Sequence, residues 1–236
     1  MDYRPQASAW DTLTGTKTLT AQGATVIKQT YLLFSLAVFS AMAGGYIGAT
    51  SETLARFFSG WIGWIAALLL LNLVPRIALS VRHNHQLGVA ALVFDGFISG
   101  IALSPLLWVA RIVAPSLIFD ALFITGFVFV GITLYVMTAR RTFSAPRGLM
   151  TGIFCSIIGA IILNSFLHIG VAGVLISIGI GALGVFTLVY STSGVLRSPD
   201  ADSPIPGALM LFAGVFNVFV ATLNILLRLL NSGRRA

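Results

Sequence analysis

The residues of this sequence that could do chemistry are the few ionisable and amide side chains inside long apolar stretches. Asp95 has apolar residues on both sides, and Asn217, Asn224 and Arg228 interrupt the last apolar stretch. Burying a charge in apolar surroundings is costly, so such a residue usually serves a functional site or a structural ion pair. Both interpretations of Asp95 stay open. The candidate polar site consists of Asp95, Arg76, Asn217, Asn224 and Arg228, with Arg76 or Arg228 as the partner of the aspartate.

The sequence contains no pattern of catalytic or metal-binding side chains. His83 and His85 fall in one loop, and His168 stands at a break between two apolar stretches, so no zinc-type spacing is formed. The one cysteine, Cys155, lies inside an apolar run, and neither a Ser–His–acid nor a Cys–His set can be assembled. We therefore predict a protein without enzymatic activity, metal or cofactor.

The composition of the chain indicates a membrane protein. Of its 236 residues, 57% are hydrophobic and 9% are charged, whereas a soluble domain carries about 25% charged residues. Since so little charge cannot cover a water-exposed globule, lipid must solvate the chain. The net charge of +7 is spread between apolar stretches, without the basic cluster that follows a nucleic-acid backbone. We expect a lipid bilayer as partner and no nucleic acid.

The apolar stretches have the length of transmembrane helices, which need about 20 residues to span a bilayer. From Gly148 to Leu196 there are 49 residues without Lys, Arg, Asp or Glu, which is too long for one helix, and we divide them at residues 168–170. The predicted fold is all-α, a polytopic bundle of seven transmembrane helices. A polar N-terminal leader, 1–30, precedes the transmembrane domain, 31–230, and a short basic tail, 231–236, follows it. The predicted spans are Tyr31–Ala49, Phe57–Leu73, Leu87–Leu107, Leu117–Met137, Leu149–Leu167, Val171–Tyr190 and Gly207–Leu230.

The placement of Lys and Arg predicts the orientation, because cytoplasmic segments carry the excess of these residues. An N-terminus inside the cell puts only Arg56 and Arg111 in outer loops. Arg228 and the two C-terminal arginines oppose this pattern, so the last segment either spans fully, with its end outside, or is re-entrant. The residues inside the cell are then Arg4, Lys17, Lys28, Arg76, Arg82, Arg140, Arg141, Arg147 and Arg197.

Small and polar residues recur at helical spacing in three of the spans. In lipid, helices associate through such residues, so we predict tightly packed seams there. A seam of this kind could also line a substrate path. The three sets are Gly96, Gly100 and Ser104 in the third span, Gly152, Ser156, Ala160, Asn164 and His168 in the fifth, and Gly214, Asn217, Ala221, Asn224 and Arg228 in the seventh.

Several segments together resemble the Bax inhibitor family, the lifeguard-like seven-helix membrane proteins, its bacterial branch included. The most specific is a G-x-x-L-S-P motif in the predicted third helix, formed by Gly100, Leu103, Ser104 and Pro105. The resemblance extends over residues 25–230, with the segments in the family's order. The other segments are Lys28–Leu33, Asp120–Thr125 followed by Gly131 and Tyr135, Asn217–Phe219, and Leu226–Leu230.

The resemblance implies a bundle wrapped around a central last helix. It implies a calcium- or proton-linked cation leak for some members, modulation of cell-death or stress pathways for others, and binding of a membrane-anchored quality-control protease for one bacterial branch. The family's leak depends on two aspartates, one in each of the last two helices. This sequence carries Ser191 and Gly214 at those positions. The carboxylate pair that would share a proton or bind calcium is therefore replaced.

These features predict a multi-pass protein of the bacterial inner (plasma) membrane that regulates membrane partners by contact. A membrane-anchored quality-control protease is the partner that the resemblance implies. The alternative is a calcium- or proton-linked cation leak channel or transporter, in which Asp95 would have to replace the missing acidic pair.

Overall fold

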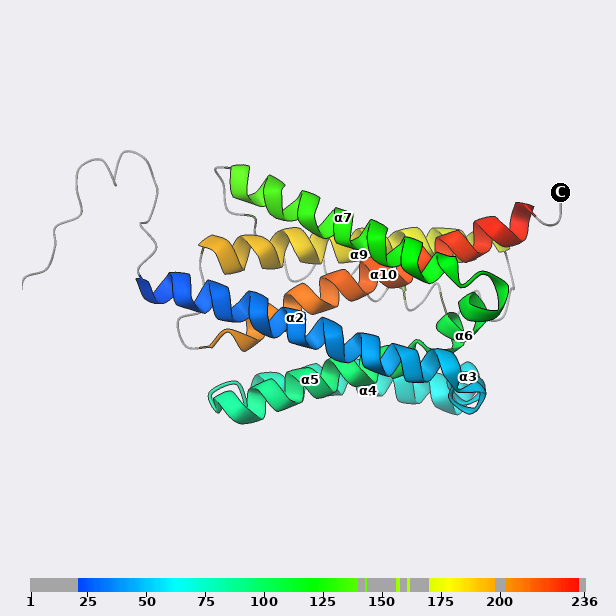
Figure 1. The fold of residues 1–236 in the computed structure, drawn as a ribbon, viewed down its shortest axis with the longest axis horizontal. Helices are drawn as coiled ribbons and strands as arrows, with labels where there is room; N and C mark the ends of the chain where they lie inside the picture. Colours follow the sequence, from blue (N-terminus) through cyan, green and yellow to red (C-terminus); the bar gives the residue numbers. More distant parts are fainter. Residues whose placement is uncertain are drawn as a thin grey trace, which may run out of the picture.

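The computed structural model describes residues 21–139, 143, 156–157, 161, 170–197 and 203–233 (Figure 1). Over these residues the chain is helical and contains no strand. The helices are α2 (Ala21–Thr50), α3 (Glu52–Ser59), α4 (Trp61–Ser80), α5 (His85–Ala102), α6 (Ser104–Val113), α7 (Ser116–Thr138), α9 (Gly170–Arg197) and α10 (Ile205–Gly233).

Six of the described helices are long and apolar enough to cross a membrane. Each corresponds to one predicted span, so the prediction of an all-α, polytopic membrane bundle is confirmed. The predicted fifth span, Leu149–Leu167, lies outside the described residues except for three positions, as do Cys155 and His168. The six segments are Gly23–Thr50, Trp61–Ser80, His85–Ala102, Ser116–Thr138, Ala172–Arg197 and Ile205–Asn231.

The second span begins later and ends later than predicted. We expected Phe57–Leu73, whereas α4 covers Trp61–Ser80. Gly60 has extended backbone angles (φ −81°, ψ 163°) and separates α4 from the short helix α3. Hydrophobicity continues across this glycine, so it could not reveal the break.

The predicted third span, Leu87–Leu107, was wrong at its C-terminal end, because two helices share those residues. α5 ends at Ala102, and α6 begins at Ser104 with Pro105 in its first turn. A proline has no N–H to donate to the carbonyl four residues earlier, so it starts a helix rather than continuing one. The Ser104 hydroxyl donates to the Ile101 carbonyl instead. The G-x-x-L-S-P motif therefore forms the turn between two helices.

Helix α10 lies at the centre of the bundle, as the family resemblance implies. It packs against α2, α4, α5, α6, α7 and α9, and Figure 1 shows it between α2 below and α7 above. Its buried side chains include Leu209, Leu211 and Phe212, which share one core cluster with Leu92 of α5 and Leu188 of α9. α10 thus joins α7 and α9 to α2, whereas α5 packs chiefly on α2 and α4 chiefly on α5.

A seam of small residues joins α5 to α2. A Cβ atom built on Gly96 would collide with the Ala37 carbonyl, and one on Gly100 would collide with the Ala41 carbonyl and lie 2.6 Å from the Gly45 nitrogen. The two backbones approach this closely only because neither glycine has a side chain, as expected of helices that associate in lipid. The predicted packing seam of the third span is confirmed at these two glycines.

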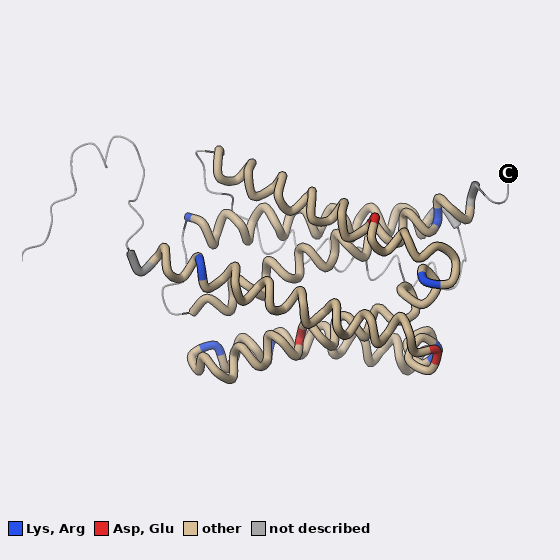
Figure 2. The backbone as a smooth tube through the Cα atoms, in the orientation of Figure 1, with Lys and Arg blue, Asp and Glu red and all other residues tan. Residues whose placement is uncertain are grey.

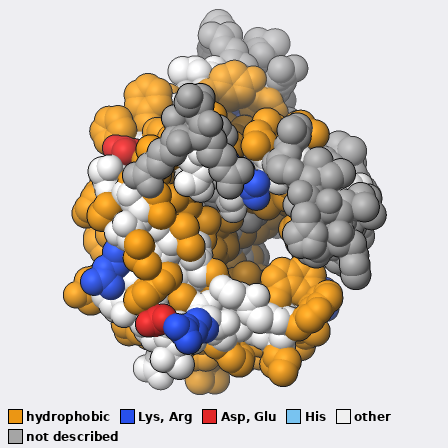
Figure 3. Space-filling view, turned by 90° about the vertical axis from the view of Figure 1, so that its right-hand side faces the viewer, with side chains coloured by type: hydrophobic (Ala, Val, Ile, Leu, Met, Phe, Trp, Pro, Cys, Tyr) orange, Lys and Arg blue, Asp and Glu red, His pale blue; other side chains and the backbone are white. Residues whose placement is uncertain are grey.

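Charged residues gather towards the two ends of the bundle, and the middle is nearly free of them among the described residues (Figure 2). Seen from the end that carries α3 and α6, hydrophobic side chains make up much of the described outline, with a few charged ones among them (Figure 3). This distribution suits a protein that lipid surrounds on its sides. The inside position of the N-terminus stays a prediction.

Candidate intramembrane polar site

Asp95 lies inside the bundle on α5 and is 4% exposed. Leu92, one turn earlier, and Ser99, one turn later, are also buried, so the aspartate belongs to the inward face of α5. It forms no hydrogen bond or ion pair with the part of the chain that the structure describes. An isolated carboxyl group in such surroundings is costly and marks a candidate functional position.

Arg76 does not face Asp95, contrary to our expectation of an ion pair between them. It lies on α4 between Val74 and Ala78, which are buried, whereas Arg76 itself is exposed. Successive helix residues are rotated by about 100°, so a residue two positions from each buried neighbour points away from the core. Within the described residues the one ion pair joins Arg56 to Glu52 on α3.

Arg228 and the two asparagines of α10 belong to the interface with α9. The Arg228 Nε donates a hydrogen bond of 3.2 Å to Asn224 Oδ1. The guanidinium lies against Gly173 of α9, where a Cβ atom would collide with it. Asn217 packs against Gly184 of α9, because a Cβ atom built on Gly184 would lie 3.0 Å from the Asn217 Cβ. No described contact joins these residues to Asp95, so the five predicted residues fall into separate places.

Ser191 and Gly214, which the family resemblance aligns with two aspartates, lie on the neighbouring helices α9 and α10. Ser191 is buried on α9, and its hydroxyl donates to the Leu188 carbonyl at 3.2 Å. A Cβ atom on Gly214 of α10 would lie 2.7 Å from Leu188 Cγ and 3.0 Å from its nitrogen. Leu188 itself is fully buried. Gly214 is therefore closed in by the Leu188 side chain of α9, while the Ser191 hydroxyl is used within its own helix.

The family motif serves the packing of three helices. Gly100 lies against α2, as described above, and Ser104 Oγ would lie 2.6 Å from a Cβ built on Gly48 of α2. Ser104 is fully buried, whereas Leu103 lines a cavity between helices. With Pro105 beginning α6, these residues set the turn and the close approach of α5 and α6 to α2.

Sequence reasoning missed a run of buried polar residues near the end of α9. Ser191, Thr192 and Ser193 are each at most 3% exposed. The Thr192 hydroxyl has no hydrogen-bond partner, and the Ser193 hydroxyl accepts from the Phe143 N–H at 3.0 Å. Their run of three consecutive hydroxyl residues, four positions before Arg197, was the available signal. Within the described residues no three His, Cys, Asp or Glu side chains lie close enough to hold a metal ion.

Comparison with known proteins supplies the family. The family model described as inhibitor of apoptosis-promoting Bax1 matches residues 23–233. The chain belongs to the Bax inhibitor family. Within this family it is similar to an uncharacterized protein of Campylobacter jejuni, with 30% identity over 205 residues that cover 85% of this chain and 87% of the relative.

Two further Bax inhibitor relatives are also similar over most of their length. An uncharacterized membrane protein of Vibrio cholerae is 27% identical over 85% of this chain and 88% of its own. The modulator of FtsH protease YccA of Escherichia coli K12 is 30% identical over 211 residues, covering 85% of this chain and 89% of YccA. Together with the six apolar helices, these relatives identify a multi-pass protein of the bacterial inner membrane.

Proposed function

We propose that this Bax inhibitor protein has no enzymatic activity and regulates a membrane-anchored quality-control protease by contact within the membrane. The observation that supports this most is that Ser191 and Gly214, which the resemblance aligns with the family's acidic pair, are neutral, and that Gly214 packs tightly against Leu188. A site built from neutral Ser191 and Gly214 lacks the carboxylate oxygens that calcium prefers. The similarity to YccA, named a modulator of FtsH protease, favours a protease as partner.

The exposed side of α7 offers a contact surface for such a partner. Phe119, Phe123 and Phe127 recur every fourth residue and are each at least 72% exposed. Gly131 continues this row, and a Cβ built there would meet no atom within 4 Å. In lipid, helix association depends on van der Waals packing at small residues. A helix of the protease would pack over Gly131, with the phenylalanines beside it.

Co-reconstitution of the chain with an FtsH-type protease in lipid nanodiscs tests this proposal. We expect the tagged chain to capture the protease and to change its rate of degrading a membrane substrate. Gly131→Trp should weaken capture at least tenfold, because the indole would hold the two helices apart. Leu69→Trp, at a position on α4 that is 62% exposed, is the matched control and should leave capture unchanged. Absence of capture, with an unchanged degradation rate, would contradict the proposal.

The alternative function, a cation leak, is favoured by one observation, the buried Asp95 without an ion pair in the described residues. Flux of calcium and protons into liposomes, measured between about pH 5 and 8, where buried carboxyl and imidazole groups titrate, tests it. If the wild type conducts and Asp95→Asn abolishes the flux, the leak function is supported. If the wild type shows no flux at any pH, contact regulation remains. An Asn variant that conducts like the wild type would make Asp95 structural.

A further inference from the structure

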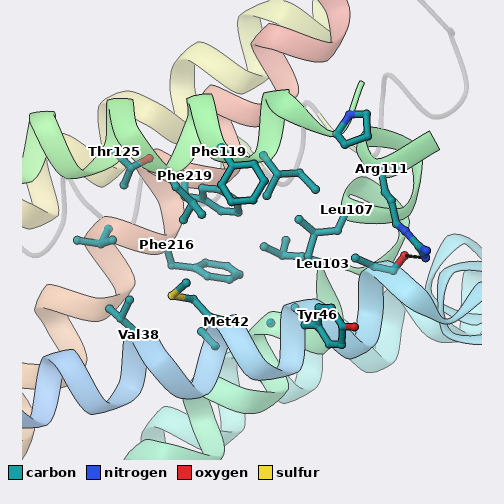
Figure 4. A pocket seen from close by; sticks show the side chains of 18 of the residues that line it. Val38, Met42, Tyr46, Leu103, Leu107, Arg111, Phe119, Thr125, Phe216 and Phe219 are labelled. Atoms are coloured by element: carbon teal, nitrogen blue, oxygen red, sulfur yellow. Dashed lines mark hydrogen bonds between the residues drawn. The ribbon is translucent and has the colours of Figure 1, made fainter. Parts of the chain in front are cut away.

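A cavity of about 440 Å³ lies between α2 and α7 (Figure 4). α2 packs against α5, α6 and α10, while α7 packs against α6, α9 and α10, so α10 forms the floor of the cavity and α6 closes one end. Phe212 on the floor is 4% exposed, whereas Met42 and Tyr46 at the mouth are 49% and 72% exposed. The cavity therefore reaches the flank of the bundle, where lipid surrounds the protein.

The wall of this cavity suits hydrocarbon rather than water. In Figure 4 the side chains of Met42, Phe216 and Leu107 point into it. The Thr125 hydroxyl on the wall donates to the Ala121 carbonyl of its own helix at 2.7 Å, and the Thr50 hydroxyl at the rim donates within α2. An ordered water needs two to four polar partners, and these hydroxyls already use their protons within the helices. An apolar occupant matches the wall better.

The volume of the cavity, about 440 Å³, is that of a site for one small ligand. Ligand sites of about 300–1,000 Å³ are typical for small molecules. A lipid chain fits within that range, and the surrounding bilayer supplies it.

One guanidinium stands at the mouth of this apolar cavity. Arg111 on α6 is exposed, and its Nη1 donates a hydrogen bond of 3.2 Å to the carbonyl of Ala49, in the last turn of α2 (Figure 4). Arginine has five N–H donors, and no described carboxylate forms an ion pair with this one. The nearby Glu52 is paired with Arg56. α2 is long and apolar enough to cross a membrane, so its C-terminal end would lie near the depth of a lipid phosphate.

We propose that this cavity binds an anionic phospholipid, with one acyl chain between α2 and α7 and the phosphate at Arg111. The apolar wall holds the chain by burying hydrocarbon. The guanidinium holds the phosphate by charge-assisted hydrogen bonds, which are shorter and stronger than neutral ones. Occupancy fills the space between two helices that are joined mainly through α10, and the lipid thereby becomes part of the bundle.

Native mass spectrometry of the full chain in detergent micelles tests the site, with dioleoyl phosphatidylglycerol and dioleoyl phosphatidylcholine as probes. We expect the wild type to retain the anionic lipid preferentially. Arg111→Gln keeps an N–H donor for α2 but removes the charge. It should lower the preference for the anionic lipid about fivefold, which corresponds to the ~1 kcal/mol that one basic residue contributes near an anionic surface. Arg111→Lys should keep it. Arg56→Gln, at an exposed arginine outside the cavity, should leave it unchanged.

A second variant tests the place of the acyl chain independently of the charge. Met42→Trp puts a larger side chain across the mouth at a half-exposed position, so it should reduce retention of both lipids at least fivefold while the protein elutes as the wild type. Equal retention by Met42→Trp and the wild type would overturn the proposal. So would a wild type without headgroup preference, or retention of a protein chain in place of phospholipid. None of these outcomes depends on the protease contact proposed above.

Discussion

Replacing Gly100 by alanine should destabilise the bundle, although the same change at Gly126 should stabilise it. Both glycines are inside helices, where alanine is favoured over glycine by about 0.5–1 kcal/mol. Their surroundings differ. A Cβ on Gly100 would collide with the Ala41 carbonyl of α2 and lie 2.6 Å from the Gly45 nitrogen, whereas a Cβ on Gly126 would meet no atom within 4 Å.

The geometry gives the size of the effect. Ordinary van der Waals contact of a Cβ begins at 3.4 Å, so relieving the collision with the Ala41 carbonyl requires α2 and α5 to separate by more than 1 Å at Gly100. Overpacking of a tight interior costs about 1–3 kcal/mol. After the helix preference of alanine is subtracted, Gly100→Ala should lose about 1–2 kcal/mol. A protein of 150–250 residues then loses about 2–8 °C in Tm. Gly126→Ala should gain up to about 1 kcal/mol.

Thermal unfolding of the wild type, Gly100→Ala and Gly126→Ala in one detergent, followed by tryptophan fluorescence, measures the differences in Tm. Gly100→Leu extends the series and should unfold at a still lower temperature than Gly100→Ala, because its larger side chain adds to the same collision. Equal shifts for Gly100→Ala and Gly126→Ala would refute the reasoning, since it would mean that the α2–α5 backbones are not in close contact at Gly100.

Three further predictions concern other parts of the bundle. Gly214→Asp should destabilise the protein by about 1–3 kcal/mol through collision with Leu188. Combined with Leu188→Ala it should cost at least ~1 kcal/mol less than the sum of the single changes, because the two positions touch; additive thermal shifts would contradict this. Arg197→Gln should lose about 1–3 kcal/mol, since Arg197 Nη2 donates a hydrogen bond of 2.8 Å to the Val136 carbonyl and ties α9 to α7; urea titration measures it, and an unchanged midpoint would mean that the bond is not formed. Reporter fusions at the two chain ends should place the N-terminus in the cytoplasm and the C-terminus outside; a cytoplasmic C-terminus would make the last segment re-entrant.

The sequence alone determined which segments are helices in the membrane and which of their faces pack closely. The hydrophobicity of a span is a sum over neighbouring residues, and a helical face is a repeat of three or four residues, so both are local properties. This is why the α5 seam at Gly96 and Gly100 could be predicted before its partner helix was known. The alignment of Ser191 and Gly214 with the family's two aspartates rests on the resemblance and stays a prediction.

Other features were decided only when the helices were assembled. Arg76 could be placed on α4 from the sequence, but the side of α4 that faces the core depends on how α4 packs. The close approach of Gly214 to Leu188 requires α9 and α10 to lie in one particular register. The cavity beside Arg111 exists because α10 and α6 hold α2 and α7 apart. These features depend on distances between residues remote in the chain, which no local pattern of hydrophobicity or spacing contains.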